Sequence, residues 1–76
     1  MLGDVAEKVE EVKKKVYEKF MEKGINPRNK QDYMERMESI AKEIAQQMFS
    51  DLDQESINVI VRITHDRIES EYQGGD

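Results

Sequence analysis

The sequence predicts an all-α protein, folded as a bundle of three helices. Apolar residues recur at helical spacing in three successive segments, and only one proline and four glycines interrupt the 76 residues. The composition agrees, because 37% hydrophobic and 38% charged residues suit amphipathic helices with solvated outer faces. We therefore expect a single helical domain over residues 1–76, with residues 1–3 and 73–76 as frayed tails.

The first predicted helix spans residues 4–23. Asp4 is expected as its N-cap, and Gly24 is expected to end it, with Ile25 folding back on Phe20 as in a Schellman motif. Between these ends, apolar residues recur at spacings of four, three, four and four. They form a narrow stripe of Val5, Val9, Val12, Val16 and Phe20.

The second predicted helix spans residues 27–49. Asn26 followed by Pro27 is typical of an N-cap and a first helical position, and Asn29 with Asp32 is an alternative start three residues later. Because the link from the first helix is short, we expect an antiparallel hairpin. The apolar face is wide enough to contact two neighbours and contains Tyr33, Met34, Met37, Ile40, Ala41, Ile44, Ala45, Met48 and Phe49.

The third predicted helix spans about residues 53–72 and has two apolar faces. The core face contains Ile57, Ile60, Val61, Thr64, Ile68 and Tyr72, and the second contains Leu52, Val59 and Ile63. Residues 57–64 are also β-prone, and the alternative is a strand that pairs across a dimer. We favour a helix because the core face continues to Ile68 and Tyr72.

The second apolar face is the main functional signal in the sequence. A domain this small often needs a partner chain, and with no cysteine and one histidine it has few other ways to gain stability. We therefore expect a non-enzymatic interaction or assembly module, a self-associating small regulator that forms a homodimer or binds another protein. Apolar helix packing would hold the contact, and charges would choose its orientation. The expected interface residues are Leu52, Val59, Ile63 and Met34.

The charge distribution suggests nucleic-acid binding as an alternative function and also argues against it. The net charge is −5, and its whole excess lies in residues 49–76, which contain seven acids (Asp51, Asp53, Glu55, Asp66, Glu69, Glu71 and Asp76) and two bases (Arg62 and Arg67). Such a chain is poorly suited to neutralising phosphates. The alternative is a nucleic-acid-associated regulator that contacts phosphate through Lys13, Lys14, Lys15 and Arg28. Acids interleave with the lysine run, so we expect nucleic acid not to be the partner.

Catalytic and metal-binding patterns are weak. His65 and Glu69 would share a helical face as an acid–base pair, with Asp66 beside them, but no further group assembles around them. The Glu-x-x-His motif of di-metal bundles fails because Arg62 occupies the position of the glutamate. We expect no enzyme activity, metal or cofactor. No apolar run is long enough to span a membrane, and without a cysteine or an export signal we expect a cytoplasmic protein.

Overall fold

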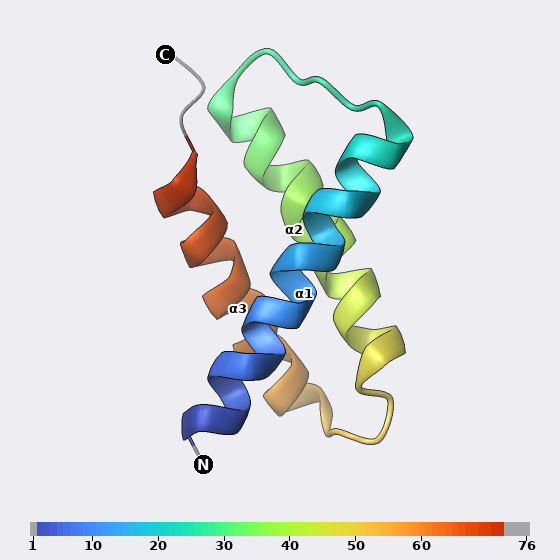
Figure 1. Cartoon of the computed structure of the whole chain (residues 1–76), viewed down its shortest axis with the longest axis vertical. Coiled ribbons are helices and arrows are strands. Elements are labelled where there is room, and N and C mark those ends of the chain that lie inside the picture. The colour runs from blue at the N-terminus through green and yellow to red at the C-terminus, as the bar shows by residue number, and fades with distance from the viewer. Residues whose placement is uncertain (1, 73–76) are drawn as a thin grey trace.

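A computed structural model describes residues 2–72 of the chain, with side chains from residue 4 onward. It contains α1 (Leu2–Lys23), α2 (Lys30–Met48) and α3 (Gln54–Glu71). Figure 1 shows that the chain runs up through α1, back down through α2 and up again through α3. All three helices pack against one another in a body of 36 × 21 × 17 Å, which confirms the predicted three-helix bundle. None of these helices within residues 2–72 has the length and hydropathy needed to cross a membrane.

The ends of α1 match the prediction at one terminus and differ at the other. The helix begins at Leu2, so Asp4 lies within the first turn, where its carboxylate complements the free backbone N–H groups. At the C-terminus Gly24 adopts a φ of 67°. The N–H of Ile25 donates to the carbonyl of Phe20 at 3.4 Å, and that of Gly24 to Met21 at 3.1 Å. These two bonds form the predicted Schellman motif.

The start of α2 is three residues later than the first of the two expected positions. Asn29 is the N-cap, and its side-chain oxygen accepts a hydrogen bond from the backbone N–H of Asp32 at 2.7 Å. The alternative start is therefore correct, and Asn26 and Pro27 belong to the link. A side-chain cap outweighs the proline signal because it satisfies a backbone donor that the helix itself leaves free. The helix ends at Met48, with Phe49 as its C-cap.

Residues 57–64 are helical, so the strand alternative is wrong. α3 runs without a break from Gln54 to Glu71, within one residue of the predicted bounds at each end. Of the predicted frayed tails, Leu2 and Gly3 are helical, whereas residues 1 and 73–76 lie outside the described part of the chain.

The three predicted core stripes meet along the axis of the bundle. The fully buried residues of these stripes include Val9, Val12, Val16, Met37 and Ile68, which come from all three helices. Aromatic rings close the end of the bundle near the α1–α2 link: the ring centroids of Phe20 and Tyr33 lie 5.1 Å apart, and those of Tyr33 and Tyr72 lie 4.9 Å apart. At the other end, the C-cap residue Phe49 is part of the core, and the Nζ of Lys8 lies 5.7 Å from its ring centroid.

Candidate functional site

A shallow apolar groove lies between the N-terminal parts of α1 and α3. Its volume is about 360 Å³, and it is lined by Val5, Lys8, Leu52, Glu55, Ser56, Val59 and Ile60. The turn between α2 and α3 holds Leu52 at the end of the groove, where its backbone N–H donates to the carbonyl of Phe49 at 3.0 Å. Two helices and one turn therefore position this groove.

Val59 is the most exposed apolar side chain of the groove, with 46% of its surface open to solvent. It points away from the bundle because its neighbours Ile57, Ile60 and Val61 are all turned into the core. Leu52 and Ile63, the other members of the predicted second face, are half-buried and pack against the edge of the core. The second face of α3 therefore exists, with Val59 nearly half exposed and Leu52 and Ile63 more fully covered.

Met34, the fourth expected interface residue, lies elsewhere. It is buried in the core at 6% exposure, because the wide stripe of α2 contacts both neighbouring helices, and it offers almost no surface to a partner. Sequence reasoning missed Val5 as part of the groove, although its place at the open end of the α1 stripe was a usable signal. It also missed Met21, which is 81% exposed because it lies beside that stripe rather than on it.

A network of charged side chains connects α1 to the C-terminal half of α3. The Nζ of Lys13 lies 2.5 Å from Glu71 and 3.3 Å from Glu10, and Arg67 lies 2.5 Å from Glu10. The hydroxyl of Tyr17 donates to Glu71 at 3.0 Å. Hydrogen bonds from Lys13, and then from Tyr17, lower the pKa of Glu71. Those from Arg67 and then Lys13 lower the pKa of Glu10.

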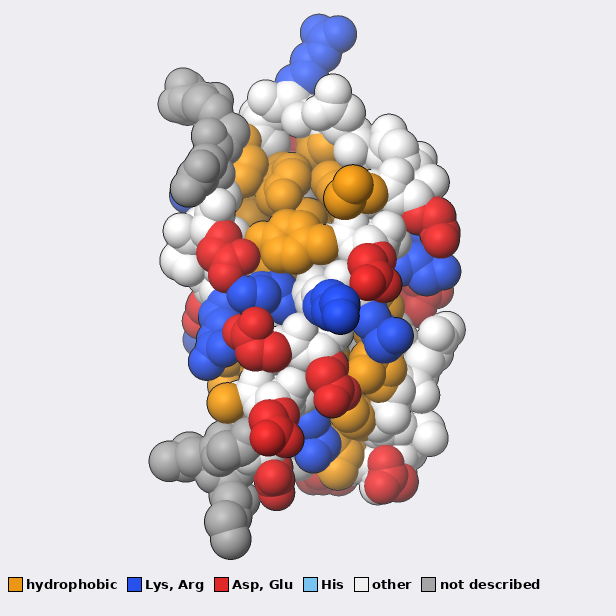
Figure 2. All heavy atoms as spheres, in the orientation of Figure 1, with side chains coloured by type: hydrophobic (Ala, Val, Ile, Leu, Met, Phe, Trp, Pro, Cys, Tyr) orange, Lys and Arg blue, Asp and Glu red, His pale blue; other side chains and the backbone are white. Residues whose placement is uncertain are grey.

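The basic residues expected to contact phosphate do not form one patch. Lys13 is held between two carboxylates of the network, whereas Lys14 and Lys15 are exposed. Arg28 lies in the α1–α2 link, and α1 continues for two further turns, or about 12 Å, between Lys15 and that link. Figure 2 shows acidic and basic side chains interleaved across the middle of one face of the molecule, so no single sign of charge dominates there.

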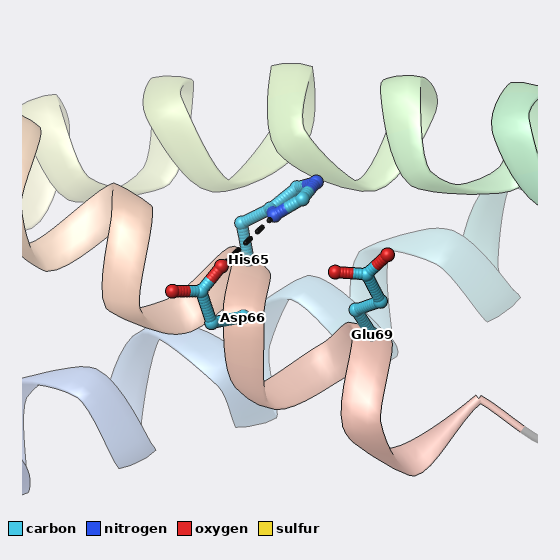
Figure 3. Close-up of side chains that lie close together, drawn as sticks. All are labelled: His65, Asp66 and Glu69. Atoms are coloured by element: carbon cyan, nitrogen blue, oxygen red, sulfur yellow. Dashed lines mark ion pairs between the residues drawn. The ribbon is translucent and has the colours of Figure 1, made fainter.

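The histidine cluster brings side chains of α2 and α3 together. Figure 3 shows His65 beside Asp66, with Glu69 one turn further along α3. The Nδ1 of His65 lies 3.6 Å from Asp66 Oδ1, and its Nε2 lies 3.6 Å from Oε1 of Glu38 on α2. His65, Asp66 and Glu69 each offer a ligand atom within 4.8 Å of the others. The expected His65–Glu69 pair is thus part of a wider group, in which Glu38 was not foreseen.

An imidazole with carboxylates is a ligand set that a divalent cation such as Zn²⁺ accepts. Here, however, cationic side chains already lie beside these carboxylates. Lys30 approaches Glu69 at 3.7 Å, and Lys42 and Arg62 line the hollow next to His65. The acidic groups thus have protein cations close by, which weakens their attraction for a metal.

No family profile, curated protein or solved structure matches this chain at a significant level. The charged network and the histidine cluster satisfy much of their charge within the chain. The groove is different, because its apolar surface can be removed from water only by another molecule.

Proposed function

We propose that the protein is a non-enzymatic interaction module that self-associates as a homodimer through the groove between α1 and α3. The observation that carries this proposal is the exposure of Val59, at 46%, in a groove that Val5, Leu52 and Ile60 also line. Burial of apolar surface contributes about 25 cal/mol for each Å² removed from water. A second copy offers the same groove, so an isologous contact covers both exposed surfaces at once. We place this role, that of a small regulator or assembly factor, in the cytoplasm.

The mixed lining of the groove supports this assignment. Lys8, Glu55 and Ser56 line it together with the apolar residues, so the surface offers polar and charged groups beside a small apolar area, as protein interfaces do. The nucleic-acid alternative has weaker support, because Lys13 is engaged by Glu10 and Glu71 and Arg28 is remote from the lysine run.

Sedimentation equilibrium over a range of protein concentrations tests the proposal. We expect the unmodified chain to move from monomer to dimer as its concentration rises, and Val59→Asp to remain monomeric, because a carboxylate in the apolar contact would lose its hydration. Met21→Asp is the matched control: it places the same charge at an exposed apolar site outside the groove and should leave dimerisation intact.

Circular dichroism of both variants checks that the helices persist, so that loss of the dimer is not confused with unfolding. A chain that stays monomeric at every concentration would contradict the proposal. So would equal loss of the dimer in Met21→Asp and Val59→Asp.

A further inference from the structure

Two charged residues of α3 differ from the others in having no ion-pair partner among the side chains that the structure describes. Within Gln54–Glu71, four charged residues pair with groups of the chain itself: Asp66 with His65, Arg67 with Glu10, Glu69 with Lys30, and Glu71 with Lys13. Glu55 and Arg62 take part in no ion pair with any described side chain of residues 4–72, and both are exposed. These two opposite charges flank the exposed Val59.

The spacing of Glu55 and Arg62 places them on one side of the apolar surface. They are seven residues apart, which is two helical turns or about 10 Å, so both lie along the same flank of Val59. Arg67 lies on the other flank, where it reaches Glu10 of α1. The flank away from α1 thus carries one acid near the N-terminus of α3 and one base further along it.

In a two-fold symmetric helix pair, the residues that face this flank depend on whether the two helices are antiparallel or parallel. In an antiparallel pair, residues of the same flank face each other across the axis, so Glu55 of each copy lies opposite Arg62 of the other. In a parallel pair, the flank faces the opposite flank of the second helix, and the two acidic N-terminal ends, each with Asp53 and Glu55, lie side by side. The antiparallel orientation also opposes the two helix dipoles.

The apolar residues fit the same arrangement. An axis that passes between Ser56 and Val59 places Val59 of one copy beside the small Ser56 of the other. It also brings Ile63 of one copy to the turn before α3 of the other, which carries Leu52, so the two half-buried members of the second face meet across the contact. The Val59–Ser56 and Leu52–Ile63 contacts each occur twice in the dimer, because the contact is isologous.

We propose that the second copy packs with its α3 antiparallel to the first, and that the two reciprocal Glu55–Arg62 pairs fix this orientation. This inference rests on the proposed function, since it assumes self-association through the groove. The apolar residues supply the affinity, whereas the charge pairs select one orientation among several that bury the same surface.

Charge reversal tests the pairing in solution. Glu55→Arg and Arg62→Glu each turn two attractions into two repulsions, and we expect either change to weaken the dimer by about fivefold at low salt. The double variant exchanges the partners, restores both pairs and should recover the dimer. A mixture of the two single variants should form heterodimers in preference to either homodimer.

Glu11→Arg and Lys14→Glu are the matched controls. They change the net charge by the same amounts at exposed positions of α1 that make no ion pair with the described residues, and they should leave the dimer unchanged. If the reversals in α3 act no more strongly than these controls while the dimer persists, the antiparallel pairing is wrong and self-association stands. If the unmodified chain never dimerises, both proposals fail.

Disulfide trapping provides a second test, because the chain contains no cysteine of its own. In the antiparallel dimer a mixture of Leu52→Cys and Ile63→Cys chains should crosslink, since disulfides form only between residues whose Cα atoms lie within about 7 Å. Neither variant should crosslink to itself, because identical positions lie far apart on opposite sides of the axis. Self-crosslinking of Leu52→Cys and of Ile63→Cys, with none in the mixture, would show a parallel pair.

Discussion

Thr64 is a fully buried polar residue within an otherwise apolar core face of α3. Its hydroxyl donates to the backbone carbonyl of Ile60 at 2.7 Å, which satisfies the buried oxygen within its own helix. The carbonyl of Ile60 also accepts the ordinary helical bond from the backbone of Thr64, so it does not depend on the hydroxyl.

We therefore expect Thr64→Val to leave stability unchanged within about 1 kcal/mol, because a methyl group replaces the hydroxyl and no buried group loses its last partner. Thr64→Ser should instead destabilise by about 1 kcal/mol, since it removes a buried methyl group. Urea unfolding of both variants measures the difference. A large loss in Thr64→Val would mean that the hydroxyl has a role beyond this bond.

Tyr17 connects stability to alkaline pH. Burial, and then its hydrogen bond to Glu71, raise the pKa of the Tyr17 hydroxyl above the ordinary value of 10. A group whose pKa is raised by folding stabilises the protein below its unfolded pKa, and this contribution is lost as the pH rises through the folded value. The neutral phenol thus favours the folded state up to about pH 10.

We expect the unmodified protein to lose stability steeply above pH 10, and Tyr17→Phe to lose it less steeply, because phenylalanine has no proton to release. Urea unfolding from pH 8 upward gives the two slopes. The lysines and Tyr33, whose pKa is also raised by burial, remain in both proteins and do not affect the comparison. Parallel slopes would show that Tyr17 ionises as freely in the folded chain as in the unfolded one.

At the level of the element, the helix caps decide where each segment begins. Asn29 makes the cap bond of α2, and Asn26 makes no hydrogen bond with another described side chain or backbone group. We expect Asn29→Ala to lower the free energy of unfolding by about 1 kcal/mol, and Asn26→Ala to change it much less. Chemical unfolding followed by circular dichroism compares them. A larger loss in Asn26→Ala than in Asn29→Ala would assign the cap to Asn26, the position favoured by the Asn-Pro signal.

The existence of all three helices could be predicted from the sequence, whereas two of their starts could not. The stripe from Val9 to Phe20 and the core face from Ile57 to Ile68 are long and regular, so their periodicity identifies helices that tertiary packing then stabilises. The start of α2 depended on a choice between two asparagines. The local sequence does not show which of the two asparagines caps the helix, because that depends on which side chain can reach a free backbone N–H group.

At the scale of the whole molecule, the two-faced character of α3 could be predicted, but the neighbours of each face could not. Val59 is exposed as expected, since it lies opposite the core residues of its own helix. The contribution of Val5 to the groove depends on the relative placement of α1 and α3, and the burial of Met34 depends on contacts from two helices. The Lys13–Glu71 pair joins residues 58 positions apart, which no local spacing reveals.

The charged network gives the whole bundle a dependence on acid pH, because it connects the first helix to the last. The pKa values of Glu10 and Glu71 are both lowered, chiefly by hydrogen bonds from Arg67 and Lys13 respectively. A carboxylate whose pKa is lowered by folding stabilises the protein above its unfolded value of about 4.5, and this contribution is lost as the pH falls through the folded value. The bundle should therefore lose stability progressively below pH 4.5.

We expect Glu71→Gln to be less stable than the unmodified chain at pH 7 and to show a shallower loss of stability below pH 4.5, because its amide stays neutral throughout. Glu18→Gln is the matched control, since Glu18 is an exposed acid of α1 without an ion pair among the described residues. Urea unfolding at a series of pH values, in low salt and in 1 M salt, measures both slopes. The difference between the slopes of Glu71→Gln and of the unmodified chain should be smaller in 1 M salt, because charges are then screened over about 3 Å. If the slopes for Glu71→Gln and Glu18→Gln coincide at low salt, the network does not couple α1 to α3.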